Sequence, residues 1–502
     1  TLPSNGGQAT VSFAVTATQS IVNEHYQVSA RGAFTAAGTA PVTTIVGTGT
    51  RYVAPGGSDG LNNCTDTGAP CATLQHAVEV ANAGEEVRVA AGTYTGAATL
   101  RHDLWGGDTY TYTQVVLIDK ALTLLGGYPA GSWTTRDPAA NSTIINAAGR
   151  GRGITVIAVG SGPVTVDGFT ITGGDYSGLG NPPGAVNTVC SGGGGEDCGG
   201  GIYAYATALV LRNTVITDNV AGRDSFSDGG GVYLWEVPAG TRIEDCIIAR
   251  NRALGEYASG GGLYAHSIRS PMTITRSTVE DNYAEGVGGG IHLYDVDAPL
   301  LIEETAFDDN TAGGGEGGGA RIRLTGDGQI LQMDRVWMRN NRADQKAAGL
   351  LLDAAGVDSP RALLTNIVFA GNATDGNGDA DAVIGIDGGF TSMEVSFAHV
   401  TAADNRTPTF LHAAPAGDAG DLLTVSLTNT LLVSFTHAFA AEEGTYGDAT
   451  IYHRNTLTHN VANLHQAIAG SPVFHAQNPL TGDPKLNRTY HLEADSTAIN
   501  AG

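Results

Sequence analysis

The residues best suited to chemistry in this sequence are two carboxylates and two guanidinium groups, on Asp295, Asp297, Arg321 and Arg323, with His292 nearby. Paired carboxylates can act as general acid and base on a glycosidic bond. These residues fall on neighbouring turns of the repeat described below, which would bring them side by side. Exposed charges on a repeated β surface are far more often a solvated face than a site. The sequence therefore favours a non-catalytic role, and these four are the catalytic candidates if there is one.

A second candidate site holds oxygen-bearing side chains at alternate positions, on Asp375, Asn377, Asp379 and Asp381. The spacing resembles the first half of a Ca²⁺-binding loop. The segment lacks the glycine at the sixth position and the distal glutamate of such a loop. A calcium site and a turn rich in Asp and Asn fit the sequence equally well, and no other cofactor is expected.

Five cysteines indicate the redox setting. Cys64 and Cys71 flank one tight polar segment, and Cys190 and Cys198 flank a glycine loop. These spacings predict two short-range disulfides and an oxidising, extracytoplasmic environment. Metal binding is the alternative, but the spacing does not match paired zinc knuckles. Cys246 alternates with apolar residues and is expected to be a buried free thiol.

Composition excludes several classes of function. Lys and Arg total 26 against 50 Asp and Glu, a formal charge of −24 over 502 residues. This balance disfavours nucleic acid and anionic membrane surfaces as partners. The chain contains no apolar run of 18 residues, so membrane insertion is not expected. It begins at Thr1 without an initiator methionine, which is typical of a processed chain.

The elements that must position these residues recur with a fixed period. Glycine triplets precede short apolar runs, at Gly199, Gly229, Gly260, Gly288 and Gly317. Asparagines close further apolar runs, and these are Asn219, Asn251, Asn282, Asn310, Asn341, Asn372 and Asn405. The steps between these asparagines, by subtraction, are 32, 31, 28, 31, 31 and 33 residues. A period of this size is typical of a solenoid.

The content of each period indicates which solenoid. Each period holds short runs of alternating or β-branched residues and no helix-length amphipathic segment. Two or three strands per turn fit the coil of a β-helix. Glycine would supply the bends, and asparagine would suit a sharp corner because it tolerates the left-handed backbone region. Stacked coils would join the asparagine amides in a ladder, which we predict for Asn219, Asn251, Asn282, Asn310, Asn341 and Asn372.

These GGG-[IVL]-Y and [IVF]-x-x-N-x-A repeats resemble the right-handed parallel β-helix proteins of the pectin-lyase-like superfamily. The closing segment Ser496–Gly502, STAINAG, resembles the S-x-A-I-[DN]-A-G ending of a bacterial surface and secreted group within it. The resemblance covers residues 51–502 and implies an all-β right-handed solenoid outside the cell. It says little about activity, because one fold hosts many functions. Polygalacturonase relatives carry Gly-His-Gly and Arg-Ile-Lys signatures. This chain contains no Gly-His-Gly, and Arg321-Ile322-Arg323 resembles the second signature with arginine in place of the lysine.

Three regions are predicted. Residues 1–50 resemble the closing strands of an Ig-like surface repeat, with fewer strands than a complete sandwich. Either the rest of that domain has been cut away, or another chain supplies the missing strands by strand exchange. Residues 51–442 should form the parallel β-helix, with a helical cap predicted over residues 72–83. Residues 443–502 should form a C-terminal cap or docking segment.

Together these features predict an extracellular, non-catalytic structural or adhesive solenoid. It would associate with copies of itself, as a filament or sheath, through its N-terminal strands. The alternative is a carbohydrate-active enzyme, either a polysaccharide lyase or a glycosidase, or a glycan-binding module on the same fold. Aromatic loop residues such as Trp105 and Trp133 support that alternative, with polysaccharide as the partner.

Overall fold

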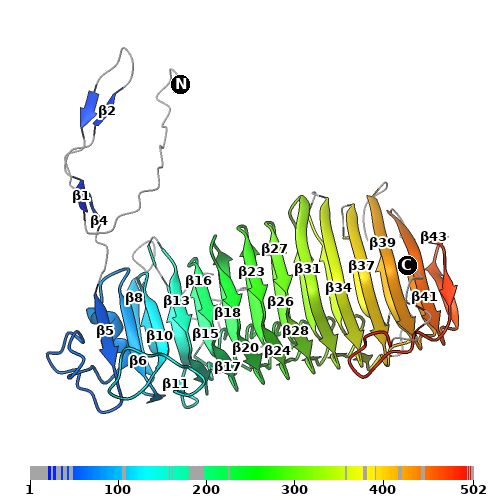
Figure 1. Ribbon diagram of the computed structural model, residues 1–502. Helices are drawn as coiled ribbons and strands as arrows, with labels where there is room; N and C mark the ends of the chain where they lie inside the picture. Colours follow the sequence, from blue (N-terminus) through cyan, green and yellow to red (C-terminus); the bar gives the residue numbers. More distant parts are fainter. Residues whose placement is uncertain are drawn as a thin grey trace.

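The protein is a long stack of β coils, seen from the side in Figure 1. The computed structural model describes the chain except residues 1–20, 24–26, 30–34, 38–41, 45–48, 104–108, 158, 161, 180–196, 224–225, 357–358, 377–380, 390–391, 416–420, 443–446, 494–495, 497 and 499–502. Each coil contributes strands to separate parallel sheets, and each strand pairs with the equivalent strands of the coils before and after it. This arrangement is a parallel β-helix.

Sheet 1 has 13 strands and is parallel except for an antiparallel pair at its N-terminal edge. In order along the rod its strands are β8 (Ala98–Asp103), β9 (Thr109–Ile118), β12 (Arg152–Val156), β15 (Ile202–Tyr205), β18 (Val232–Val237), β22 (Leu263–Ile268), β26 (Ile291–Val296), β30 (Ala320–Leu324), β33 (Leu350–Ala354), β36 (Ala382–Asp387), β38 (Thr409–Ala414), β40 (His437–Glu442) and β42 (Asn463–Ala469).

Sheet 2 has 22 strands, usually two from each coil with a bend between them. They are β5 (Thr50–Val53), β6 (Glu86–Ala90), β7 (Gly92–Tyr94), β10 (Thr123–Tyr128), β11 (Thr143–Asn146), β13 (Val164–Asp167), β14 (Thr170–Thr172), β16 (Leu209–Arg212), β17 (Val215–Thr217), β19 (Arg242–Glu244), β20 (Ile247–Ala249), β23 (Met272–Thr275), β24 (Thr278–Glu280), β27 (Leu300–Glu303), β28 (Ala306–Asp308), β31 (Gly328–Arg339), β34 (Pro360–Ala370), β37 (Met393–Ala403), β39 (Asp421–Val433), β41 (Gly447–His459), β43 (Val473–Gln477) and β44 (Leu480–Thr481).

Sheet 3 is narrow and lies just after the predicted asparagines in the chain. Its strands are β21 (Arg252–Ala253), β25 (Tyr283–Ala284), β29 (Thr311–Ala312), β32 (Arg342–Ala343) and β35 (Ala373–Thr374). One coil therefore runs from sheet 1 through two strands of sheet 2 to sheet 3, and a glycine triplet starts the next coil.

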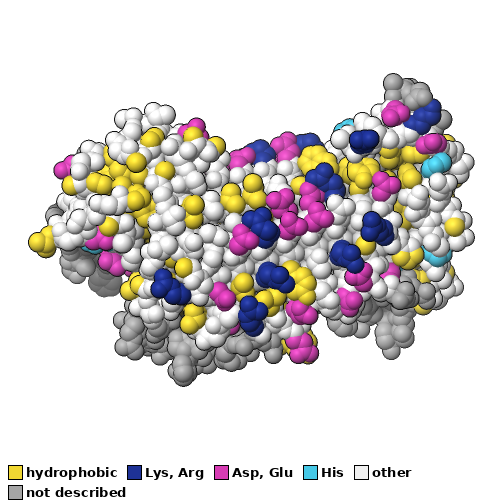
Figure 2. Space-filling model, turned by 90° about the horizontal axis from the view of Figure 1, so that it is seen from below, with side chains coloured by type: hydrophobic (Ala, Val, Ile, Leu, Met, Phe, Trp, Pro, Cys, Tyr) yellow, Lys and Arg dark blue, Asp and Glu magenta, His cyan; other side chains and the backbone are white. Residues whose placement is uncertain are grey.

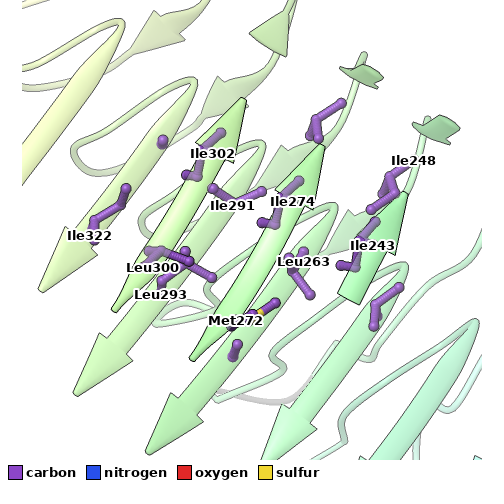
Figure 3. Close-up of a cluster of buried hydrophobic side chains, with 14 of the residues drawn as sticks. Ile243, Ile248, Leu263, Met272, Ile274, Ile291, Leu293, Leu300, Ile302 and Ile322 are labelled. Carbon is purple, nitrogen blue, oxygen red and sulfur yellow. The ribbon is translucent and has the colours of Figure 1, made fainter. Parts of the chain in front are cut away.

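The core fills the inside of the coils, where inward side chains from successive coils stack on one another. Figure 3 shows Leu263 and Ile291 of sheet 1 facing Ile274 and Ile302 of sheet 2. All four are at most 1% exposed. Burial of such stacked aliphatic side chains is the main favourable term that holds the coils together.

The asparagine ladder runs through seven coils inside the rod. Each side-chain amide donates to the oxygen of the next asparagine, at 2.9–3.1 Å from Asn219 through to Asn405. The same amide also donates to a backbone carbonyl of the preceding coil, as Asn282 does to Ile248 at 2.8 Å. The oxygen of Asn282 also accepts the backbone N–H of Asn251 at 3.0 Å. Each ladder asparagine is thus hydrogen-bonded to both the side chain and the backbone of the neighbouring coil.

The bends differ from the prediction in one respect. The left-handed residue at this corner is not the ladder asparagine but the residue before it, as at Asp218 (φ 57°), Arg250 (φ 53°) and Asp281 (φ 53°). The ladder asparagine instead points its amide inward. The first glycine of each triplet has a positive φ, for example 63° at Gly260, as a bend supplied by glycine requires.

At the N-terminal end, α1 (Leu74–Val80) begins at Thr73, whose side chain accepts from the backbone N–H of His76. Its apolar face, Leu74, Ala77 and Val78, is buried. The helix packs against the first coil, where Gln75 Oε1 accepts the backbone N–H of Leu117 at 2.7 Å.

Two antiparallel pairs precede the β-helix: β1 (Ile21–Asn23) with β4 (Val42–Thr44), and β2 (Gln27–Ser29) with β3 (Thr35–Ala37). These short pairs fall within the region predicted to be Ig-like, most of which lies outside the described residues.

The β-helix extends beyond the predicted boundary at residue 442. Strand β41 pairs in parallel with β39 from Gly447 to His459, and β42, β43 and β44 complete a further coil. The proline-rich turns after residue 470 hid this coil in the sequence. Only the segment from Asp483 onward leaves the stack.

Candidate functional site

The outward face of sheet 1 carries two columns of side chains along the rod. The first column follows the register from Tyr203 through Tyr233 and Tyr264 to His292 and Arg321. The three tyrosine rings stack, with centroids 5.5 and 5.3 Å apart. All three are at most 4% exposed, so this column is part of the packing.

The second column, Tyr205, Trp235, His266 and Tyr294, lies two residues further along the same strands and is half-buried. Trp235 stacks on His266 with centroids 4.1 Å apart, and His266 on Tyr294 at 4.8 Å. Rings stacked this closely cover each other's faces, so mainly their edges remain for a ligand. A sugar-stacking platform needs exposed faces, which this column does not offer.

An ionic cluster continues the second column toward the C-terminal end. Arg321 Nη2 donates to Asp353 Oδ2 at 2.7 Å, and Arg323 Nε to Asp353 Oδ1 at 2.9 Å. Arg323 also donates to the Tyr294 hydroxyl at 2.9 Å, and its guanidinium lies 4.9 Å from the centre of that ring. Asp353 is 4% exposed. Both oxygens of this buried carboxylate are therefore paired with a guanidinium group.

Lys346 extends the cluster by one more coil, since its Nζ lies 2.6 Å from Asp387 Oδ2 and 3.8 Å from Glu316. Burial lowers the pKa of Lys346, but the Asp387 carboxylate outweighs burial and raises that pKa overall. Asp353 likewise outweighs burial and raises the pKa of Arg323. Both side chains are therefore held protonated, and neither is poised to accept a proton near neutral pH.

Two histidines beside this cluster are buried. Burial lowers the pKa of His292 well below its ordinary value, and its ring meets Tyr264 and Tyr294 edge-to-face. His412 Nε2 lies 2.9 Å from Glu442 Oε1. Within the described residues, His412 Nδ1 and Asp387 Oδ1 are buried atoms without a hydrogen-bond partner.

The catalytic candidates predicted from the sequence are only partly brought together. Arg321 and Arg323 converge, but on Asp353, which the sequence analysis did not single out. Asp295 accepts from Thr325 Oγ1 at 3.0 Å and lies 3.7 Å from Arg269. Asp297 is exposed in the turn that follows β26. The sequence does contain one indication of this role for Asp353. It directly follows the run Leu350–Leu352, one repeat after the two arginines, which is the position equivalent to Arg323.

The predicted calcium ligands are only partly described. Asn377 and Asp379 lie outside the described residues. Both carboxylate oxygens of Asp375 accept from Arg342 Nη2, at 2.6 and 2.9 Å, and Asp381 is buried. Within the described chain, the cluster of three metal-ligating side chains is Cys64, Cys71 and His76. Its two sulfurs are joined in a disulfide, so this cluster does not fit a metal ion.

The remaining cysteines and aromatic residues have structural surroundings. Cys198 is disulfide-bonded, and Cys190, its predicted partner, lies outside the described residues. Cys246 is free and buried. Trp133 is 6% exposed and packs against Tyr52 and Tyr128, whereas Trp105 is not described. Trp133 therefore stabilises a loop against the rod.

Three comparisons with known proteins bear on these observations. The family model described as "Right handed beta helix region" matches residues 141–380. No curated protein matches the chain. Among solved structures, pectate lyase Pel9A aligns at 12% identity and a TM-score of 0.37, covering 90% of this chain and 91% of the lyase. An alginate lyase from Paenibacillus sp. aligns at 13% and 0.30, covering 84% and 99%.

At those TM-scores neither lyase informs the activity of this chain.

The one described helix that packs on the coils has seven residues, and no helix in the described part is long and apolar enough to cross a membrane. The matched family model and the stacked parallel coils agree, so this chain has the right-handed parallel β-helix fold that the resemblance of its repeats implied.

Proposed function

We propose that this protein is a rigid extracellular rod with a non-catalytic structural or adhesive role, which associates with copies of itself. The observation that carries this proposal is the coil-to-coil pairing of its polar side chains, above all the ladder from Asn219 to Asn405. A buried ladder whose donors and acceptors are used between coils stiffens the molecule. Its contribution is to the shape and stiffness of the molecule.

Three features support the proposed extracellular location and the proposed self-association. The Cys64–Cys71 disulfide fits an oxidising compartment outside the cytoplasm. Among the described residues before the β-helix, β1 to β4 form two short antiparallel pairs, which fits a segment that pairs further with another chain. A net charge of −24 keeps such rods in solution and limits non-specific lateral contacts.

Electron microscopy of the native, untreated protein tests this proposal. We expect elongated particles joined into longer assemblies. A matched sample in which residues 1–48 have been removed should lose the contacts made by the N-terminal strands. Particles that stay single at every concentration would refute the assembly part of the proposal.

A second candidate function is recognition or processing of a glycan at the ionic cluster. The specific observation is the pair of buried, unpartnered atoms, Asp387 Oδ1 and His412 Nδ1, which lie on the outer side of sheet 1 next to Lys346. An unsatisfied buried acceptor costs about 1–3 kcal/mol, which a ligand hydroxyl would recover.

A glycan screen separates the two candidates. Neutral and anionic polysaccharides are assayed for binding and for new reducing or unsaturated ends, with wild type, Asp387→Asn and Asp448→Asn. Binding or turnover that Asp387→Asn abolishes would favour the glycan function, provided that the control Asp448→Asn, an exposed residue on sheet 2, preserves it. No response from wild type supports the structural one.

A further inference from the structure

The C-terminal end of the rod is an open edge. Strand β42 pairs with β40, and β43 pairs with β41; within the described residues neither strand has a neighbour on its other side. Figure 1 shows β43 at the end of the stack, opposite the end that carries α1. The backbone N–H and C=O groups of this last coil are therefore available to another strand.

The described residues of the C-terminal segment do not cover this edge but lie along the side of the rod. The Tyr490 hydroxyl donates to Asp404 Oδ2 at 3.3 Å, 86 residues away in the chain. Leu492 and Ala498 line a side groove of about 370 Å³ together with His399 and Asn429, which belong to earlier coils. These described residues therefore leave the end of the stack open.

The open edge also lacks the charges that normally prevent edge-to-edge pairing. No Asp, Glu, Lys or Arg occurs between residues 455 and 482, the longest such run in the chain. Val473 in β43 is 43% exposed. Exposed edge strands of soluble proteins usually carry lysines or prolines that block further pairing, and β42 and β43 contain neither.

We propose that this end is an interface for a second copy of the same chain, with β42 of each copy paired antiparallel across a two-fold axis. With a net charge of −24, two copies repel each other over most of their surfaces. The uncharged end is where they can approach most closely. At the opposite end α1 packs against β5, β6 and β9, and its apolar face is already buried, so we place the contact between two C-terminal ends, which form a closed dimer.

This pairing does not depend on the proposed function, because it would hold equally for a rod that binds glycans. It also differs from association through the N-terminal strands, which would build longer chains. If both contacts form, C-terminal ends pair with each other and N-terminal strands join one dimer to the next. Successive rods in such a filament would point in opposite directions.

The mass of the full chain in solution tests the proposal. At micromolar concentration we expect particles of at least twice 51.3 kDa. The double variant Ala469→Lys, Gln477→Lys places like charges on both edge strands, where both residues are exposed. It should weaken the C-terminal contact by about tenfold or more, because like charges repel across an interface. The control Thr95→Lys, Thr135→Lys adds the same charge at exposed positions near the other end and should have no effect.

A cysteine scan along β42 tests the register. Gln466 is the middle residue of Asn463–Ala469, so a two-fold antiparallel pair would place it next to its own copy, with Cβ atoms about 4.5–5.5 Å apart. Under oxidation, Gln466→Cys should form a covalent dimer at least as fast as any other β42 position. Cys246 is buried and does not compete.

Two results would overturn the proposal. One is a wild-type chain that is monomeric at all concentrations with no cross-link from any β42 cysteine. The other is an assembly whose mass is the same in the edge-lysine variant and the control, which would place the contact elsewhere, for example on the N-terminal strands.

Discussion

At the scale of single residues, the asparagines show how one side chain can fasten three coils. Asn282 donates to Ile248 and to Asn310, and its oxygen accepts from Asn251. It is 1% exposed. Every bonding group of the amide is used, so no substitution reproduces its pattern of two donors and an acceptor.

We therefore expect Asn282→Asp to destabilise the middle of the rod by about 3 kcal/mol, because it removes both donors and buries a charge. Hydrogen exchange at the neighbouring backbone amides, Asn251 included, should accelerate, with melting temperature as a second measurement. The matched control is Asn429→Asp at an outer bend, where the side-chain oxygen accepts from Asn455 and can still do so after the change. Equal effects at both positions would contradict this account.

The period of the asparagines was enough to predict the ladder, because a fixed repeat forces equivalent residues into one column. The same reasoning did not find Asp353. Which carboxylate an arginine reaches depends on the direction of a long, flexible side chain, and the repeat does not encode that direction. The ionic cluster therefore became visible only in three dimensions.

At the scale of elements, the glycine triplet performs two different tasks. Gly260 has φ 63°, a backbone conformation that glycine adopts without strain. Gly261 is chosen for space, since a Cβ there would lie 2.4 Å from the carbonyl oxygen of Tyr283 and 2.5 Å from that of Gly289. The bends were predicted from glycine, but their exact residues were not. A sharp corner needs one left-handed residue, and the residue before a ladder asparagine fills that position, usually Asp or Arg but also Asn340 and Gly371.

We expect Gly261→Ala to disrupt coil stacking by more than about 2 kcal/mol, since the methyl group overlaps rigid backbone. The control is Gly160→Ala, because no atom lies within 4 Å of a Cβ at that position. Thermal unfolding of the two variants gives the comparison. A stable Gly261→Ala protein would show that the coils can move apart at little cost.

The last coil is expected to respond to acid. Burial, with a smaller contribution from His465, lowers the pKa of His453 from 6.5 to about 4. The two rings share a hydrogen bond of 2.8 Å between their Nε2 atoms. Between pH 6.5 and 4 His453 binds a proton in the unfolded state but not in the folded state. The free energy of unfolding is therefore highest above this window and falls by up to about 3 kcal/mol as the pH drops through it. Hydrogen exchange in β41 and β42 measures the loss, which His453→Phe should reduce and the exposed control His475→Phe should not.

At the scale of the whole molecule, surface charges are paired between coils along the rod. Arg250 binds Asp218, and Arg276 binds Asp245, each across one coil boundary. Figure 2 shows basic and acidic side chains interspersed over the face seen from below. Such pairs add little stability each, but each of them links two successive coils.

The excess negative charge should control how rods approach one another. We expect side-by-side association to rise as the pH falls from 7 toward the isoelectric point of about 4.7. Added salt should promote it at pH 7, because the screening length shrinks to about 8 Å at 0.15 M ionic strength. Light scattering against pH and salt measures the effect. Scattering that stays constant through this range would contradict a charge-controlled contact.

Cys246 lies deep in the wall of the rod, 2% exposed, and burial raises the pKa of its thiol to about 12. An alkylating reagent can reach this sulfur only when the surrounding coils separate. The rate at which the thiol is consumed therefore reports the frequency of rupture in the middle of the solenoid. The chain carries its own probe of mechanical integrity, which needs no added label.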